Sequence, residues 1–210
     1  KEIFDYVGEA EMIITQHTPL NAEIIQAAKK CKAIGVCRAG VENVDVAAAT
    51  KEGIAVFHTM GRNANAVSDY TIAMMLCEMR NVARAHAALR QGEWKKQYSN
   101  AAFVGDMYEK TIGLVGFGYI GHVVAKKLSG FDVRILVYDP FAQKEDVEAS
   151  GAELVSLEEL CRESDFISMH ARLSEETRGL IGAKEFALMK PTAYVINTAR
   201  AGLIDEQALI

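Results

Sequence analysis

Three glycines near the middle of the chain have a spacing that suits phosphate binding. Gly116, Gly118 and Gly121 form G-x-G-x-x-G within "TIGLVGFGYIGHVVAKKL", between an apolar run and a helical pattern. The first glycine permits a tight turn, the second allows close approach of a pyrophosphate, and the third allows close packing of helix on sheet. Backbone N–H groups around Tyr119 and Ile120 would face the phosphates, and the helix dipole favours negative charge there. The pattern predicts a dinucleotide site.

A carboxylate follows at the end of the next apolar run. Residues 133–139 read "VRILVYD", so Asp139 ends a predicted strand and is followed by Pro140 and Phe141. An acidic side chain there can accept hydrogen bonds from both ribose hydroxyls of the adenosine half of the cofactor. It would repel a 2′-phosphate, and no arginine follows, so the sequence predicts NAD rather than NADP. A glycine-rich turn without a ligand, beside an incidental aspartate, is the alternative.

An arginine stands just beyond the last apolar run, in "YVINTARAG" at 194–202. A charged side chain next to a buried strand needs a partner, because burying an unpaired charge is costly. Asp205 and Glu206 are close enough in sequence to offer Arg200 a local ion pair, and a bound anion is the other possibility.

The apolar runs alternate with helical patterns, which predicts an α/β protein with parallel sheets and right-handed crossovers. The first group has strands at 11–15, 33–37 and 54–58, with helices at 21–31 and 44–53 between them. The second group has helices at 119–129, 156–163 and 183–189, and its strands are expected at 111–116, 133–139, 151–155, 164–170 and 192–198.

The two groups are joined by a stretch without glycine or proline from Asn65 to Arg90. One continuous helix of about 26 residues would be roughly 39 Å long and could cross between domains or subunits. Its methionines are expected in core packing rather than in a cofactor box. Residues 90–100, "RQGEWKKQYSN", are expected to form a linker.

Composition narrows the possible partners. The chain is 50% hydrophobic and 24% charged, with a net charge of −5 and no basic stripe, which excludes nucleic acid as a partner. No apolar run approaches the roughly 18 residues of a membrane span, and no leader pattern opens the chain. The cysteines form no C-x-x-C pair and the histidines lack metal-ligand spacing, so we expect reduced thiols, a cytoplasmic protein and no metal.

Four stretches together resemble the D-isomer-specific 2-hydroxyacid dehydrogenase family, which includes phosphoglycerate dehydrogenase. They are "GLVGFGYIG", "VYDP", "HARLSEETRGLIG" and "MKPTAYVINTARAGLIDEQAL", and the earlier "CRAGVENVDVAAATKEGIAV" resembles the family's substrate domain. The resemblance implies two doubly wound domains, a flavodoxin-like substrate domain at 1–100 and a Rossmann domain at 101–210 that binds NAD. It also implies an active site in the cleft between them, and a homodimer built partly on the long helix.

The resemblance also carries roles for single residues. Arg200 matches the arginine that binds the carboxylate of a small 2-hydroxy or 2-oxo acid and steadies its 2-oxo group. His170 matches a cofactor contact rather than the catalytic acid. The other matches line the nicotinamide (Val67, Thr198 and Ala199) or supply loop amides to the substrate carboxylate (Gly40 and Val41).

The family's acid–base histidine and its supporting glutamate would lie beyond Ile210, and the chain is expected to be a fragment truncated at both ends. The loop in "RAGVENVD" is shorter than the family's usual turn, which puts phosphoglycerate in question as the substrate. The sequence favours an NAD-dependent dehydrogenase of a D-2-hydroxy acid. The alternatives are an NAD(H)-sensing regulator or scaffold on the same fold and, less favoured, a formate dehydrogenase.

Overall fold

The computed structural model describes residues 2–210, and Lys1 lies outside the described residues. The chain divides into two compact units, residues 1–62 and 63–210, each with its own sheet. We describe each unit separately. The predicted domain division, 1–100 and 101–210, stays a prediction; in the structure the helix that begins at Ala64 packs within the second unit.

The first unit is a three-stranded parallel sheet in the order β1-β2-β3. Every strand and both helices predicted for this region are confirmed. Side chains cap two of the helices: Asn21 accepts a hydrogen bond from the Ile24 amide at 3.1 Å, and Asp45 from the Ala48 amide at 2.9 Å. The elements are α1 (Glu2–Val7), β1 (Met12–Thr15), α2 (Ala22–Ala27), β2 (Ala33–Val36), α3 (Val46–Lys51) and β3 (Ala55–His58).

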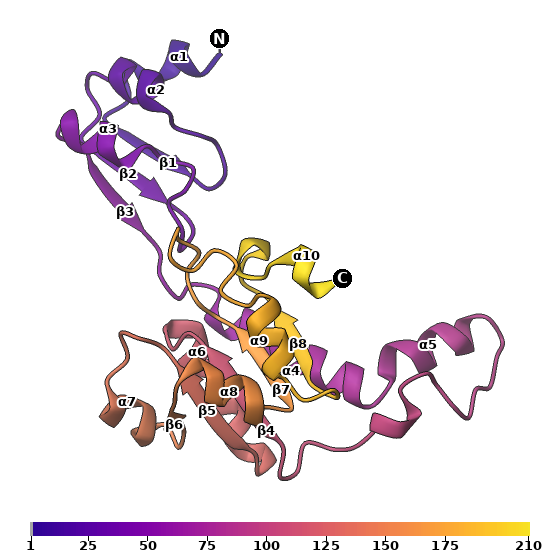
Figure 1. Cartoon of the computed structure of the whole chain (residues 1–210). Helices are drawn as coiled ribbons and strands as arrows, with labels where there is room; N and C mark the ends of the chain where they lie inside the picture. Colours follow the sequence, from indigo (N-terminus) through magenta and orange to yellow (C-terminus); the bar gives the residue numbers. More distant parts are fainter. Residues whose placement is uncertain (1) are drawn as a thin grey trace. The chain divides into compact units, whose positions relative to one another are not determined.

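The helices of this unit cover one face of its sheet (Figure 1). Ile34 and Val36 of β2 are buried under them, whereas Met12, Ile14 and Phe57 on the opposite face are 63%, 70% and 63% exposed. Parallel sheets are usually buried on both faces. The doubly wound, flavodoxin-like arrangement predicted for this part of the chain therefore stays a prediction, because the described residues form one helical layer.

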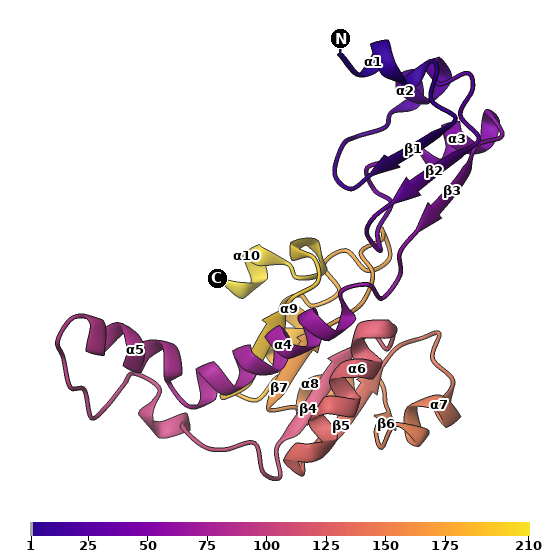
Figure 2. The ribbon, with the colours of Figure 1, turned by 180° about the vertical axis from the view of Figure 1, so that it is seen from behind.

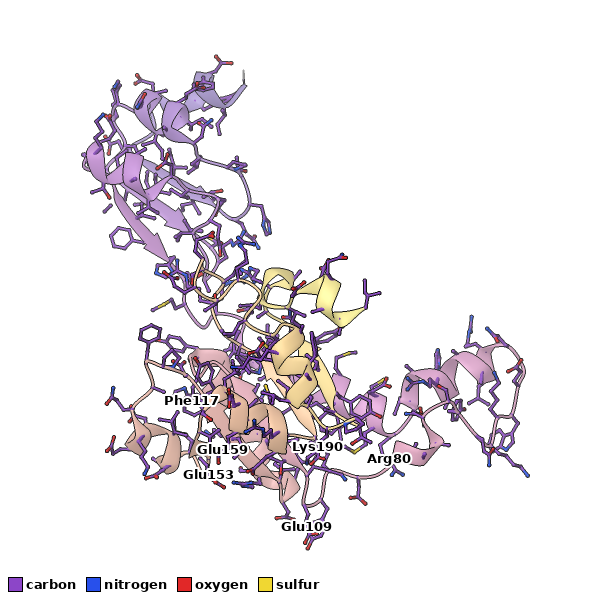
Figure 3. The ribbon with its side chains drawn as sticks, viewed as in Figure 1. Arg80, Glu109, Phe117, Glu153, Glu159 and Lys190 are labelled. Carbon is purple, nitrogen blue, oxygen red and sulfur yellow. The ribbon has the colours of Figure 1, made fainter. Side chains whose placement is uncertain are left out.

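The second unit is a five-stranded parallel sheet in the order β6-β5-β4-β7-β8. The chain adds β5 and β6 on one side of β4 and then β7 and β8 on the other side, so the strand order reverses at β4. In such sheets ligands bind at the carboxyl ends of the strands, at the point of reversal. The strands are β4 (Thr111–Val115), β5 (Arg134–Tyr138), β6 (Glu153–Leu154), β7 (Phe166–Met169) and β8 (Tyr194–Asn197). Figure 3 labels Glu109 and Phe117, which mark the two ends of β4.

Helices cover both faces of this sheet (Figures 1 and 2). Ile112 and Leu114 of β4 pack under α4 and α6, while the alternate residue Val115 belongs to a second buried cluster with Leu160 and Cys161 of α8. The predicted helices of this unit are confirmed as α6 (Tyr119–Leu128), α8 (Leu157–Glu163) and α9 (Ala183–Leu188). The unit also contains two short helices, α7 (Lys144–Ala149) and α10 (Glu206–Leu209).

The prediction of one continuous helix from 65 to 90 is wrong. The structure has α4 (Ala64–Met79) and α5 (Val82–Arg90), with a break at Asn81. Asn81 has φ 56°, the left-handed conformation that asparagine tolerates better than most residues. Its buried side chain accepts a hydrogen bond from Arg84 at 3.0 Å, which holds the break. Helix α5 projects away from the sheet, whereas α4 packs on it through Met75 and Met79 (Figure 2).

Candidate functional site

The glycine turn joins β4 to α6, and its geometry explains two of the three glycines. Gly116 has φ +100°, and a Cβ there would lie 2.5 Å from the amide nitrogen of Ala171. A Cβ on Gly121 would lie 2.5 Å from the carbonyl oxygen of Gly116. Both obstacles are backbone atoms, so a side chain at either position would separate the turn from β7 or from its own helix.

The remaining glycine faces open space. Nothing lies within 4 Å of a Cβ built on Gly118, which is exposed and forms the N-cap of α6. The first N–H groups of a helix have no partner within it, so the amides of Tyr119 and Ile120 are available to a bound anion. The turn fits a pyrophosphate: backbone approaches backbone closely at Gly116 and Gly121, and no atom lies within 4 Å of a Cβ position at Gly118.

Asp139 follows β5 and contacts this turn directly. Its Oδ2 accepts a hydrogen bond from the Phe117 amide at 2.8 Å, and its Oδ1 accepts one from the Phe141 amide at 2.9 Å. A carboxylate has about four acceptor positions, so each oxygen can still accept a hydroxyl. Asp139 is therefore fixed in orientation by two amides and keeps the capacity to accept two ribose hydroxyls.

His170 follows β7, beside the first glycine. Its Nε2 lies 2.9 Å from Oγ of Ser168, a side chain that is fully buried in the sheet. Burial lowers the pKa of His170 to about 4, because the charged imidazolium is poorly solvated there. The ring is therefore neutral at pH 7, which makes it a poor proton donor.

The residues predicted for the nicotinamide, Thr198 and Ala199, and the predicted substrate residue Arg200 follow β8 in a turn organised by one side chain. Asn197 ends β8; its Oδ1 accepts from the Ala199 amide at 3.0 Å, and its Nδ2 donates to the Arg200 carbonyl at 2.9 Å. Arg200 is exposed, and its guanidinium donates to the Ala199 carbonyl at 3.0 Å. Thr198 bonds the buried Thr71 of α4, with their hydroxyl oxygens 2.9 Å apart.

The structure brings most of the predicted residues to one edge of the five-stranded sheet. The glycine turn, Asp139, His170 and the turn after β8 all follow carboxyl ends of parallel strands. Val67 is half-buried on α4, one helical turn before Thr71 and on the same face.

Gly40 and Val41 lie in the first unit, in the loop between β2 and α3. This loop is closed by an ion pair of Arg38 with Glu42 at 2.8 Å and by a backbone bond from the Val44 amide to the Val41 carbonyl at 2.9 Å. Both predicted residues are half-buried. Their assignment to the substrate carboxylate stays a prediction.

Other predictions from composition concern the cysteines and membrane spans. Cys31 and Cys161 are buried and Cys37 and Cys77 are half-buried, all as free thiols. Burial raises the pKa of Cys161 to about 11, so this thiol stays protonated and unreactive at pH 7. Within residues 2–210, no helix combines the length and the apolar character that crossing a bilayer demands.

Several residues that organise the site were missed in the sequence: Asn197, Ser168, Thr71 and the Phe117 amide. An asparagine at the end of a strand is a recognisable turn signal, so Asn197 could have been found. The other three act through partners distant in sequence, and only the fold brings those partners together.

Comparison with known proteins agrees with this geometry. Residues 72–210 match the family described as "D-isomer specific 2-hydroxyacid dehydrogenase, NAD binding domain". The chain is 39% identical over 211 residues to D-3-phosphoglycerate dehydrogenase of Methanocaldococcus jannaschii, covering 100% of this chain and 40% of that relative. It is 40% identical over 213 residues to glyoxylate reductase of Thermococcus litoralis, covering 99% of this chain and 64% of that relative.

Among solved structures, D-lactate dehydrogenase of Aquifex aeolicus in complex with NAD and lactic acid superimposes with a TM-score of 0.86 at 30% identity. That match covers 98% of this chain and 61% of the other. The α/β fold, the glycine turn and the match to the family domain together define the class of this protein. The chain belongs to the D-isomer-specific 2-hydroxyacid dehydrogenase family and carries that family's NAD-binding domain. It spans from about two-fifths to about two-thirds of the length of these relatives.

Proposed function

We propose that this chain is part of an NAD-dependent oxidoreductase that interconverts a D-2-hydroxy acid and its 2-oxo acid. The observation that carries the proposal is the turn between β4 and α6, whose glycines leave an open, amide-lined surface next to the Asp139 carboxylate. The family membership supports the same reaction. Nicotinamide chemistry supplies a hydride to the 2-oxo carbon, or takes one from the 2-hydroxy acid.

The residues of the second unit divide the binding task by chemistry. The amides of Tyr119 and Ile120 would hold the pyrophosphate, and Asp139 the ribose of the adenosine half. Asp139 carries a negative charge where NADP has a further phosphate, so NAD is the preferred cofactor. His170 is assigned to a cofactor contact, and Thr198, Ala199 and Val67 are assigned to the nicotinamide half, as the family resemblance implies.

Arg200 is the one catalytic residue that we assign. A guanidinium presents two parallel N–H groups to a carboxylate, which fixes both the position and the orientation of a small acid. It can also stabilise the negative charge that develops on the 2-oxo group as the hydride arrives. Gly40 and Val41 of the first unit are assigned to the substrate carboxylate.

Reduction of a ketone also consumes a proton, and His170 is unsuited to supply it. Burial holds its ring neutral at pH 7, and Nε2 is occupied by the Ser168 hydroxyl. A general acid works best when its pKa lies near the working pH. The proposal therefore assigns the proton to a group other than His170.

The substrate is proposed only as a class, a small 2-hydroxy or 2-oxo acid. The relatives named above carry the names of enzymes for phosphoglycerate, glyoxylate and lactate. All three acids share the carboxylate that Arg200 would bind and the adjacent oxygenated carbon. The side chain beyond that carbon is what distinguishes them.

We also propose a homodimer, supported by apolar side chains on α4, α5 and the following loop. Tyr70, Val82, Leu89 and Trp94 are 60%, 56%, 55% and 80% exposed in the chain alone. Exposed apolar surface of this kind is typical of protein interfaces. Light scattering of the full-length protein during size-exclusion chromatography tests this: a dimer mass supports it, and a monomer mass at micromolar concentration refutes it.

The experiment for the enzymatic proposal uses the full-length protein with NADH and glyoxylate, pyruvate, hydroxypyruvate or 3-phosphohydroxypyruvate. Nicotinamide absorbance reports turnover, with Arg200→Ala as the test variant and Arg162→Ala, an exposed arginine on α8, as the matched control. Turnover that is lost in Arg200→Ala and kept in Arg162→Ala supports the proposal. Tight NADH binding without turnover of any acid would contradict it and favour a regulatory protein.

A further inference from the structure

The turn that carries Arg200 is held from two directions. Asn197 fixes its backbone from within, through its bonds to the Ala199 amide and the Arg200 carbonyl. Thr71 of α4 holds its first side chain, Thr198, from a position 127 residues away in sequence. The internal bonds set the shape of the turn, whereas the bond to Thr71 sets its place relative to α4.

Thr71 places a polar hydroxyl group in the buried face of α4. Its side chain is fully buried, and burying a polar group is unfavourable unless it forms a hydrogen bond. A threonine inside a helix can bond the carbonyl four residues earlier, which would satisfy it locally. Thr71 instead reaches Thr198 at 2.9 Å, so the polar atom links two elements.

The helix that carries Thr71 is also fixed to the helix of the glycine turn. Lys127 of α6 donates from Nζ to the Asn65 carbonyl at 3.1 Å, to Ser68 Oγ at 2.8 Å and to Asp69 Oδ1 at 2.5 Å. These three acceptors use the full donor capacity of an ammonium group. Ser68, like Thr71, is fully buried. These two polar residues of α4 contact different elements: Ser68 contacts α6, and Thr71 contacts the turn after β8.

Helix α4 therefore connects α6, the helix that follows the glycine turn, with the turn after β8; the proposed function assigns the cofactor phosphates to the start of α6 and the substrate to the turn after β8. From these contacts we infer that Thr71 is a positioning residue: it sets the turn at 198–200 relative to the glycine-turn helix, using α4 as the rigid link that Lys127 anchors. This inference rests on the proposed function only for its catalytic consequence. The link itself is a property of the chain without cofactor.

The experiment uses the full-length protein and three variants. Thr71→Val removes the hydroxyl at nearly constant shape, and Thr71→Ser keeps it. Thr50→Val is the control, because the Thr50 hydroxyl donates within its own helix, to the Val46 carbonyl at 2.8 Å. Amide hydrogen exchange is measured in the full-length proteins without cofactor and is followed at residues 194–203. We expect exchange at 198–201 to rise about fivefold in Thr71→Val and to stay at the wild-type rate in the other two.

Kinetics give the second readout. Thr71→Val is expected to lower kcat for the best 2-oxo acid about fivefold with the Kd for NADH within twofold, and Thr71→Ser to restore kcat. In a Thr198→Val background, Thr71→Val should have no further effect on exchange, because the two variants remove the same bond.

The outcomes separate this inference from the proposed function. The positioning role is overturned if exchange is unchanged in Thr71→Val, or if it rises equally in Thr71→Ser, which keeps the hydroxyl. Suppose that the wild-type protein reduces none of the acids, while exchange rises in Thr71→Val and stays at the wild-type rate in Thr71→Ser. That result supports the positioning role and contradicts the proposed function.

Discussion

Replacing Asp139 separates the structural contacts of its carboxylate from the ribose contact that we propose for it. The Phe117 amide, which donates to Oδ2 at 2.8 Å, is partly buried, whereas the Phe141 amide, which donates to Oδ1 at 2.9 Å, is exposed. In Asp139→Ala the exposed amide regains water, but the Phe117 amide is left without a partner. Leaving a buried donor unpaired costs about 1–3 kcal/mol of folding free energy.

For a unit of this size, about 2 kcal/mol corresponds to a Tm lower by roughly 4–8 °C. Asp139→Asn should cost less, because the amide oxygen can still accept from Phe117. Both variants lose the charged acceptor for the ribose, worth about 1.5–3 kcal/mol, so the Kd for NADH should rise about 10- to 100-fold in each. The two variants thus differ in stability and agree in affinity.

Thermal unfolding without cofactor and fluorescence titration with NADH measure the two effects, with Asp5→Ala on α1, an exposed aspartate, as the control. A Tm of Asp139→Ala equal to that of the control would refute the structural task of the carboxylate. An unchanged Kd for NADH in both variants would refute the ribose assignment.

Three further predictions concern the same edge of the sheet. Gly118→Ala should leave the Tm without cofactor within about 2 °C of wild type, because its Cβ meets no atom within 4 Å, yet it should raise the Kd for NADH more than about tenfold. Gly121→Ala should lower both the Tm and the affinity for NADH, because its Cβ would lie 2.5 Å from the Gly116 carbonyl oxygen. Equal Tm losses in the two variants would contradict this contrast. The folded-state pKa of His170, about 4, lies below its ordinary value of 6.5, so the unfolded chain binds more protons between those pH values. The free energy of unfolding should therefore fall by about 3 kcal/mol as the pH drops from 6.5 to 4. Denaturant titrations of His170→Gln over the same pH range should show a fall that is smaller by this amount. Arg200→Lys keeps the charge but not the paired N–H geometry, so steady-state kinetics should show a KM for the 2-oxo acid about tenfold higher with the Kd for NADH within twofold, and an unchanged KM would count against a bidentate contact.

The sequence predicted the order and type of the elements because hydrophobic periodicity is a local signal. Every predicted strand is present, since short β-branched runs bounded by turns leave few alternatives. The break at Asn81 was missed because nothing in the periodicity from 65 to 90 marks it. It depends on a left-handed asparagine whose side chain is held by Arg84.

The candidate site could be predicted from sequence only where its residues fall within short motifs. The spacing of the glycines can be recognised in the sequence because it has a steric cause: a Cβ on Gly116 or Gly121 would lie 2.5 Å from a backbone atom. The bonds from Phe117 to Asp139 and from Thr71 to Thr198 join segments that only the folded sheet brings together. Local patterns therefore identify which residues could bind a dinucleotide, and tertiary contacts determine how those residues are held.

The most direct test of the central claim is stereochemical. Full-length protein is incubated with NAD and the separate D and L enantiomers of lactate and glycerate, and the formation of NADH is followed by absorbance, with NADP in parallel. The proposed function predicts reduction of NAD by a D enantiomer, with little or no reaction of the L enantiomer and a weaker reaction with NADP. Oxidation of the L enantiomers, or a preference for NADP, would contradict it.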